Sequence, residues 1–138
     1  MGYSAFRAAG QISENGFSAR DLLQLVRGNS TLKGEKEGRT NILFLGYGGK
    51  GNPGGTLADT NLLFSYNYSD KKVALISFPR DLYLPIGKTG SYNKLNYAYA
   101  SGEENPKATG GGGAVASDTI ANISDVSVHY YVSMDFVG

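Results

Sequence analysis

Four charged side chains in the middle of the sequence have types and spacing suited to binding phosphate and a metal ion. Arg80 and Asp81 are adjacent in SFPRDLYLP, Asp59 closes a glycine-rich stretch some 20 residues earlier, and Lys94 follows in YNKLN. A guanidinium offers a planar fork of donors to phosphate oxygens, and carboxylate oxygens are the ligands that Mg²⁺ prefers. The candidate chemistry is therefore anion binding assisted by an oxygen-ligated cation.

Each of these residues also has an ordinary structural interpretation. Taken alone, the tripeptide containing Arg80 and Asp81 is more typical of an exposed salt-bridged pair, and Lys94 is typical of a solvated helix face. A helix predicted for residues 92–100 would place Lys94 near its positive end, where the dipole disfavours a cation. A lysine in that position is expected to meet an anion. Both interpretations stay open on spacing alone.

The elements that must position these residues follow from apolar patterning and turn signals. Strands are predicted for residues 41–45, 60–68, 72–78 and 126–136, and the NYSDK segment predicts a hairpin turn between the second and third. Helices are predicted for residues 18–27, 92–100 and 114–123. This order predicts the α/β class, as a layered α/β/α domain with a central mixed sheet, incomplete at its C-terminus. Residues 1–39 are interpreted as a leader helix with a polar linker, and residues 40–138 as the domain.

The predicted strand order creates a difficulty for a metal site. If the second and third strands pair antiparallel, Asp59 and Asp81 are expected at opposite ends of the pair. Their approach would then require residues 82–85 to fold back, or the glycine loop at residues 46–59 to reach over. Spacing alone does not predict a metal site.

Composition excludes several functional classes. The 138 residues suffice for one domain, and a net charge of +1 offers no field for nucleic acid. The sequence has no cysteine and a single histidine, which excludes disulfides, thiolate zinc sites and a cysteine nucleophile and disfavours a Ser-His-Asp hydrolase. It has no apolar run of about 18 residues, so none of it is expected to span a membrane.

The glycine loop offers a nucleotide-binding alternative. Residues 46–51 match G-x-G-x-x-G after a strand, with Asp70 about 20 residues on, as in a dinucleotide fingerprint. Dinucleotide binding needs a helix to begin at the third glycine, and the NPGG segment that follows cannot begin one.

The single histidine, His129, is interpreted as a packed strand residue. The tyrosines are interpreted as packing and cross-strand pairs rather than as a sugar-stacking stripe, namely Tyr66, Tyr68, Tyr83, Tyr92, Tyr97, Tyr99, Tyr130 and Tyr131.

Five segments in order carry a resemblance to a known family. They are NILFLGYGGKG, ADTNLLFSYN, KKVALISFPRDLYLPI, YNKLNYAYASG and HYYVSMDFVG. Together they resemble the LytR-CpsA-Psr family over residues 40–138, as the N-terminal half of its catalytic domain. The ordered combination of the Asp59, Arg80-Asp81 and Lys94 segments is more specific than any one of them.

The resemblance implies a Mg²⁺-dependent phosphotransferase at the outer face of the bacterial cytoplasmic membrane. It implies transfer of a teichoic acid or capsule-like glycopolymer from a polyprenyl-pyrophosphate carrier to peptidoglycan. Asp59 and Asp81 match the metal-associated aspartates, Arg80 and Asp81 the catalytic positions, and Arg80 and Lys94 the residues that bind substrate phosphates. The partners so implied are the lipid-linked glycan, the peptidoglycan acceptor and, through a segment outside this sequence, the membrane.

The sequence also departs from the family pattern. Ala58 stands where the family usually has serine, and the glycine loop is longer than its common form. The family's later arginine-rich segment and its preceding membrane anchor do not occur in these 138 residues. We therefore expect a part that is inactive alone, exposes apolar surface, and associates with itself or with a missing half. The alternatives are a non-catalytic envelope module that binds polyprenyl phosphate or wall glycan and, less favoured, a nucleotide-binding α/β domain.

Overall fold

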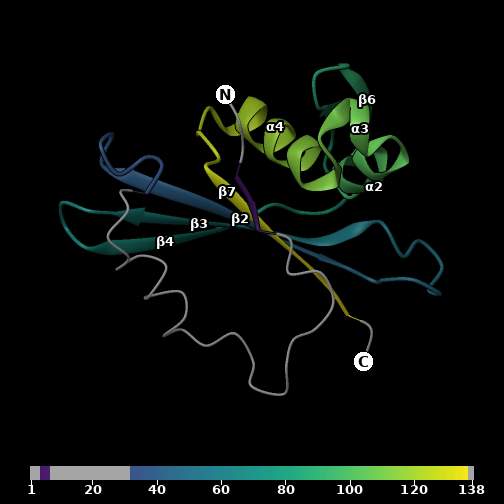
Figure 1. The fold of residues 1–138 in the computed structure, drawn as a ribbon, viewed down its shortest axis with the longest axis horizontal. Coiled ribbons are helices and arrows are strands. Elements are labelled where there is room, and N and C mark those ends of the chain that lie inside the picture. The colour runs from purple at the N-terminus through teal and green to yellow at the C-terminus, as the bar shows by residue number, and fades with distance from the viewer. Residues whose placement is uncertain (1–3, 7–31, 137–138) are drawn as a thin grey trace.

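The computed structural model describes residues 4–6 and 32–136 (Figure 1). Five strands form a mixed sheet in the order β1-β7-β2-β3-β4, and β5 and β6 form a separate hairpin. The strands are Ser4–Phe6 (β1), Arg39–Tyr47 (β2), Ala58–Asn67 (β3), Lys72–Ser77 (β4), Tyr83–Ile86 (β5), Ser91–Lys94 (β6) and Tyr130–Asp135 (β7). The described helices are Tyr97–Glu104 (α2), Pro106–Thr109 (α3) and Gly112–Ser124 (α4). The predicted α/β class and mixed sheet are confirmed.

Strand β2 lies in the middle of the sheet and pairs antiparallel with β3 and parallel with β7. Leu43 and Leu45 are fully buried, whereas Ile42 and Phe44 on the opposite face are only half-buried. A continuous apolar run such as NILFL is typical of a strand buried on both faces, but here only one face is fully buried. The difference arises because the described helices all lie on one side of the sheet (Figure 1).

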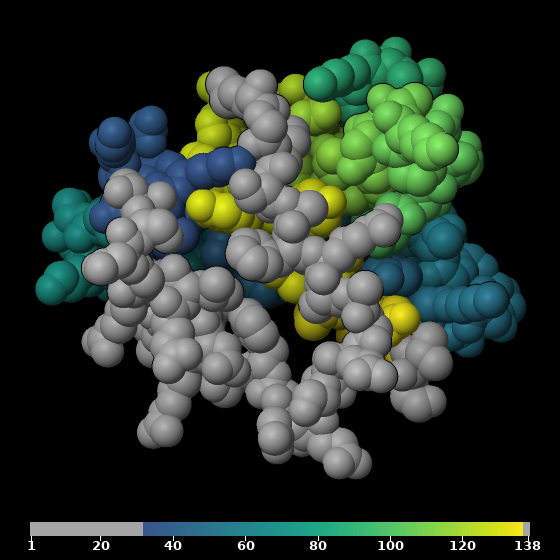
Figure 2. Space-filling model, viewed as in Figure 1, coloured from purple at the N-terminus to yellow at the C-terminus, as the bar shows by residue number. Residues whose placement is uncertain are grey.

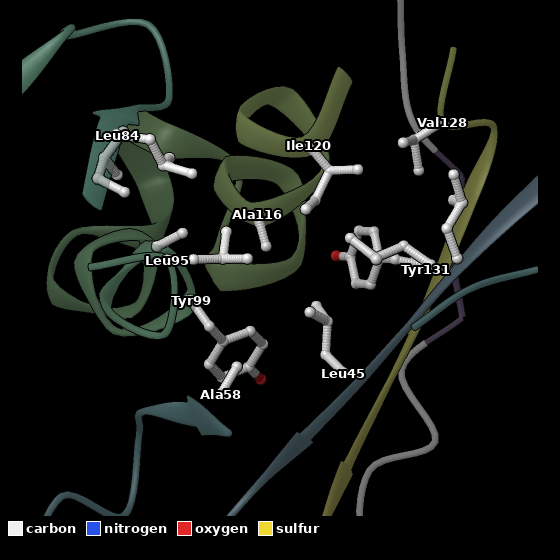
Figure 3. Close-up of a cluster of buried hydrophobic side chains, with 13 residues drawn as sticks. Leu45, Ala58, Leu84, Leu95, Tyr99, Ala116, Ile120, Val128 and Tyr131 are labelled. Carbon is white, nitrogen blue, oxygen red and sulfur yellow. The ribbon is translucent and has the colours of Figure 1, made fainter. Parts of the chain in front are cut away.

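The main core lies between the sheet and helices α2 and α4 (Figure 3). Tyr131 of β7 and Leu45 of β2 point toward Ala116 and Ile120 of α4, and Leu95 lies beyond them. A side chain at Gly113, in the first turn of α4, would overlap the Tyr131 ring. The helix predicted for residues 114–123 therefore begins earlier, at Gly112, because only glycine lets it approach the sheet this closely.

Two predicted elements need correction. Residues 92–100 were predicted as one helix, but Ser91–Lys94 is strand β6 and the helix α2 begins at Tyr97. The hairpin forms because Gly87 and Gly90 adopt positive φ at its turn, while Leu84 and Ile86 are buried in the core. Tertiary burial has overridden a helical pattern.

The remaining differences are smaller. The last strand is Tyr130–Asp135 rather than residues 126–136, and neither β1 nor α3 was predicted. The helix predicted for residues 18–27 lies outside the described residues. Strand β4 forms one edge of the described sheet and is exposed along its whole length, including Val73, Leu75 and Ile76.

Candidate functional site

Asp59 is the extra residue of a β-bulge between β2 and β3. Gly46 pairs with Thr60 and Tyr47 with Ala58, so Asp59 has no cross-strand partner. The buried side-chain amide of Asn61 donates a hydrogen bond to the Ala58 carbonyl oxygen at 2.9 Å, across the bulge. A bulge interrupts the alternation of the pleat and redirects a side chain. Asp59 is thereby exposed at the start of β3.

Arg80 and Asp81 follow the end of β4, at the same end of the hairpin as Asp59. Leu62 near the start of β3 pairs with Ser77 at the end of β4. The expectation that Asp59 and Asp81 would lie at opposite ends was therefore wrong. Antiparallel pairing necessarily places the start of the first strand beside the end of the second.

The segment after β6 connects these two positions. The Leu95 amide donates to the Leu82 carbonyl at 2.8 Å, and the Asn96 amide donates to the Arg80 carbonyl at 3.0 Å. The Asn96 carbonyl in turn accepts from the Ala58 amide at 2.9 Å. Asn96 therefore holds the bulge and the Arg80 segment side by side through its backbone. The sequence had not assigned it a role, and only its place in the KLN segment beside Lys94 could have suggested one.

Asp59, Arg80, Asp81 and Lys94 form what we call the charged cluster. Arg80 Nη1 lies 3.1 Å from Asp59 Oδ1, and Arg80 Nε lies 3.7 Å from Asp81 Oδ2. Lys94 Nζ donates to Asp81 Oδ1 at 2.8 Å. The structure thus brings together all four residues singled out in the sequence. Lys94 does so from the end of strand β6, not from a helix start as predicted.

The charged cluster is open to solvent. Its side chains are 49% (Asp59), 53% (Arg80), 61% (Asp81) and 59% (Lys94) exposed. The hydrogen bond and charge of Lys94, reinforced by Arg80, hold the pKa of Asp81 below its ordinary value of 3.8. Asp81 is therefore ionised throughout the neutral range. Exposed ion pairs of this kind add little to stability, and their cations remain accessible to an incoming anion.

The carboxylates of the cluster fit one kind of metal site. No group of three or more His, Cys, Asp or Glu side chains able to hold an ion occurs among residues 4–6 and 32–136. Mg²⁺, however, commonly takes one or two carboxylates from the protein and completes its octahedral shell with water and substrate phosphates. Asp59 and Asp81 both contact the Arg80 guanidinium, one at Nη1 and the other at Nε, so the two carboxylates flank one cation. This donor set fits a Mg²⁺–phosphate complex in which Arg80 donates its hydrogen bonds to phosphate rather than to carboxylate.

The other candidates lie elsewhere. The glycine loop closes on itself, since Gly49 donates to the Gly55 carbonyl at 2.8 Å, and it leads into strand β3 rather than a helix. It therefore lacks the helix N-terminus that a dinucleotide site requires. Asp70 lies in the β3–β4 turn and its carboxylate is 4.0 Å from Lys72 Nζ. His129 is half-buried just before β7, and its Nδ1 accepts a hydrogen bond from the Asn41 amide at 2.9 Å.

Within the described part of the chain, no helix has both the length and the apolar character needed to cross a bilayer.

Comparison with known proteins agrees with the geometry. The sequence matches the LytR_cpsA_psr family over residues 8–138. The chain belongs to this family. One relative is the Enterococcus faecalis polyisoprenyl-teichoic acid–peptidoglycan teichoic acid transferase TagU, to which this LytR_cpsA_psr chain is 35% identical over 81 residues. That alignment covers 59% of the chain and 24% of the relative. The chain is 29% identical over 112 residues to the Bacillus cereus protein of the same name, covering 81% of the chain and 34% of the relative.

A solved structure supports the fold assignment. The crystal structure of B. subtilis TagU superposes with a TM-score of 0.53 at 28% identity, covering 70% of this LytR_cpsA_psr chain and 35% of that one. The chain therefore spans about a quarter to a third of the length of these relatives. Its α/β sheet and helices correspond to part of the domain found in them.

Proposed function

We propose that this chain supplies the pyrophosphate-binding part of a cell-envelope phosphotransferase. The donor is a glycopolymer carried on polyprenyl pyrophosphate, and the acceptor is a sugar hydroxyl of peptidoglycan at the outer face of the membrane. The relatives named TagU transfer teichoic acid to peptidoglycan, which supports a polymer of that class. In the reaction the hydroxyl oxygen bonds to the glycan-bearing phosphorus, the bridging P–O bond of the pyrophosphate breaks, and polyprenyl phosphate leaves, taking up the hydroxyl proton.

Arg80 and Lys94 are the residues proposed to bind the pyrophosphate. Arg80 faces Asp59 through Nη1 and Asp81 through Nε, which lie on different sides of the guanidinium. Two phosphate oxygens can take the place of one of these carboxylates, on the Nη1–Nη2 edge or the Nε–Nη2 edge, because a guanidinium binds carboxylate and phosphate in the same bidentate manner. Lys94 adds a second positive charge from the other side of Asp81. Both would offset the charge that accumulates on the leaving phosphate.

Asp59 and Asp81 are the residues proposed to hold Mg²⁺. Bound there, the ion would neutralise phosphate charge and fix the orientation of the phosphorus. Asp81 is poorly suited to accept the hydroxyl proton, because its lowered pKa makes it a weak base at neutral pH. We therefore assign Asp81 to ion binding and to positioning Lys94. Arg80 remains the residue in direct contact with the reacting phosphates.

The single observation that carries the proposal is Arg80 lying between two carboxylates, Asp59 at the start of β3 and Asp81 in the segment after β4. The same observation leaves room for a second function. The two cations and two anions of the charged cluster compensate one another, which suits a module that binds lipid pyrophosphate without turning it over. A non-catalytic binding module is therefore the alternative. Release of polyprenyl phosphate in the presence of peptidoglycan fragments would distinguish transfer from binding.

Calorimetric titration with farnesyl pyrophosphate, with Mg²⁺ or with EDTA, tests the binding step. Arg80→Lys keeps the charge but loses the fork, and we expect it to weaken binding at least tenfold. Arg39→Lys is the matched control, because Arg39 donates to Ser65 Oγ at 3.2 Å and lies at the opposite end of β2. Equal binding by wild type and Arg80→Lys would reduce Arg80 to a surface salt bridge and remove the proposed site.

A further inference from the structure

The β5–β6 hairpin has one buried face and one exposed aromatic face. Leu84 and Ile86 on β5 are buried in the core, and the residues that alternate with them point the other way. Cross-strand register pairs Tyr83 with Lys94 and Pro85 with Tyr92. These four residues therefore share the outer face of the hairpin. The hairpin itself lies beside helices α2 and α3 (Figure 2).

Tyr83 and Tyr92 are unusually exposed for a contacting aromatic pair. Their rings lie 5.7 Å apart between centroids at 39°, yet Tyr83 is 71% and Tyr92 60% exposed. On sequence alone these tyrosines are interpreted as packing residues and cross-strand pairs rather than as a sugar-stacking stripe. Tyr99 is a packing residue, since it is buried and stacks on Tyr47 at 4.8 Å. Tyr83 and Tyr92 contact each other across the hairpin, but neither contributes to the core.

The aromatic face is continuous with the charged cluster. Tyr83 stands directly across the strand pair from Lys94, and directly opposed residues have Cβ atoms about 5 Å apart. Lys94 Nζ in turn contacts Asp81. A phosphate bound by Lys94 would therefore lie beside the face that carries Tyr83, and the group attached to that phosphate would be the one nearest to this face. In a glycosyl pyrophosphate, that group is the first sugar ring.

We propose that Tyr83 and Tyr92 form a stacking platform for the phosphate-proximal pyranose of the glycan. The face of an aromatic ring is electron-rich and attracts the weakly positive C–H hydrogens on the face of a sugar. The tyrosine hydroxyls keep the platform compatible with water, as the sugar's own hydroxyls require. This inference rests on the proposed function, because the phosphate site positions the sugar. It adds a specificity element that distinguishes a glycosylated carrier from a bare lipid pyrophosphate.

The test compares two ligands on the whole chain by calorimetry: farnesyl pyrophosphate, and the same compound bearing N-acetylglucosamine on its terminal phosphate. We expect Tyr83→Ala and Tyr92→Ala each to weaken binding of the sugar-bearing ligand about fivefold, while leaving the bare pyrophosphate unchanged. Tyr83→Phe and Tyr92→Phe keep the ring and should bind like wild type. Both positions are exposed, and unchanged thermal unfolding of each variant would verify that it folds.

Four outcomes separate this inference from the function on which it rests. Equal loss for both ligands would show that the tyrosines contact the lipid, and no loss for either would show that they contact neither; both results overturn the platform while the phosphate site stands. Loss in the phenylalanine variants equal to that in the alanine variants would assign the effect to the hydroxyls and overturn stacking. Failure of wild type to bind either ligand would overturn the proposed function and the platform together.

Discussion

Buried core residues adjoin the charged cluster in sequence, Ala58 beside Asp59 and Leu95 beside Lys94, yet the core and the cluster are held in different ways. The core side chains of β2, α4 and β7 are almost completely removed from water, whereas all four members of the charged cluster are about half exposed. Burial of apolar surface contributes strongly to stability, and exposed ion pairs contribute little. Substitutions in the two regions should therefore separate stability from binding.

The largest effect is expected from shortening a core leucine. Leu45 is fully buried, so Leu45→Ala should lower the free energy of unfolding by about 3 kcal/mol through lost burial and a residual cavity. Leu75→Ala makes the same change at a position that is 63% exposed on β4 and should cost less than about 1 kcal/mol. Urea unfolding measures both. Similar losses at the two positions would mean that β4 is covered in solution.

A smaller effect, of opposite sign to the usual rule, is expected at Gly113. Replacing a helical glycine with alanine normally stabilises by up to about 1 kcal/mol. Here a Cβ would overlap the Tyr131 ring, so Gly113→Ala should instead destabilise by about 2 kcal/mol. The same urea experiment decides the sign. A gain in stability would show that α4 packs less closely on β7 than described.

In the charged cluster, a substitution should change ligand binding more than stability. Arg80→Ala removes two exposed ion pairs and should change the free energy of unfolding by less than about 1 kcal/mol. Its affinity for farnesyl pyrophosphate should nevertheless fall by more than tenfold. Thermal unfolding and calorimetry on one preparation give both quantities. If Arg80→Ala unfolded readily, Arg80 would be a structural residue, and substitutions in the core and in the charged cluster would not separate stability from binding.

The smallest expected effect is a pH dependence located at His129. Burial lowers the pKa of this histidine; the charge of Lys33 adds to this effect and that of Glu37 opposes it. Its unprotonated Nδ1 accepts a hydrogen bond from the backbone amide of Asn41. The unfolded chain therefore binds a proton more readily, so the stabilisation is complete above about pH 6.5 and declines as pH falls toward and through the folded pKa. The urea midpoint should be lower at pH 5.5 than at pH 7.5.

A matched variant isolates this histidine. His129→Asn keeps an acceptor near Nδ1 but cannot be protonated, so its urea midpoint should change less between pH 5.5 and 7.5. His129 is the only histidine of the chain, which leaves that window largely free of other titrating side chains. An equal pH response in wild type and His129→Asn would attribute the dependence to another group.

The sequence predicted the core better than the arrangement of the site. Strand β2, the β3–β4 hairpin and helix α4 were predictable because apolar periodicity and turn residues are local signals. The four charged residues could also be recognised as candidates from their types and spacing in the sequence. Their arrangement was not, since it depends on a bulge at Asp59, a turn after Pro79 and the backbone bonds of Asn96, all of which arise from pairing between distant segments. The β5–β6 hairpin was missed for the same reason, because its strands are short and stabilised by burial against α4.

The charged cluster as a site for a metal–pyrophosphate complex is the central claim, and the binding of Mn²⁺ as a spectroscopic substitute for Mg²⁺ tests it most directly. Free Mn²⁺ would be measured by electron paramagnetic resonance while wild type and the Asp59→Asn/Asp81→Asn variant are titrated, with and without farnesyl pyrophosphate. We expect wild type to remove Mn²⁺ from solution at least tenfold more tightly with the pyrophosphate present, and we expect the double variant to lose that gain. Identical Mn²⁺ binding by the two proteins in the presence of farnesyl pyrophosphate would contradict the assignment of these carboxylates.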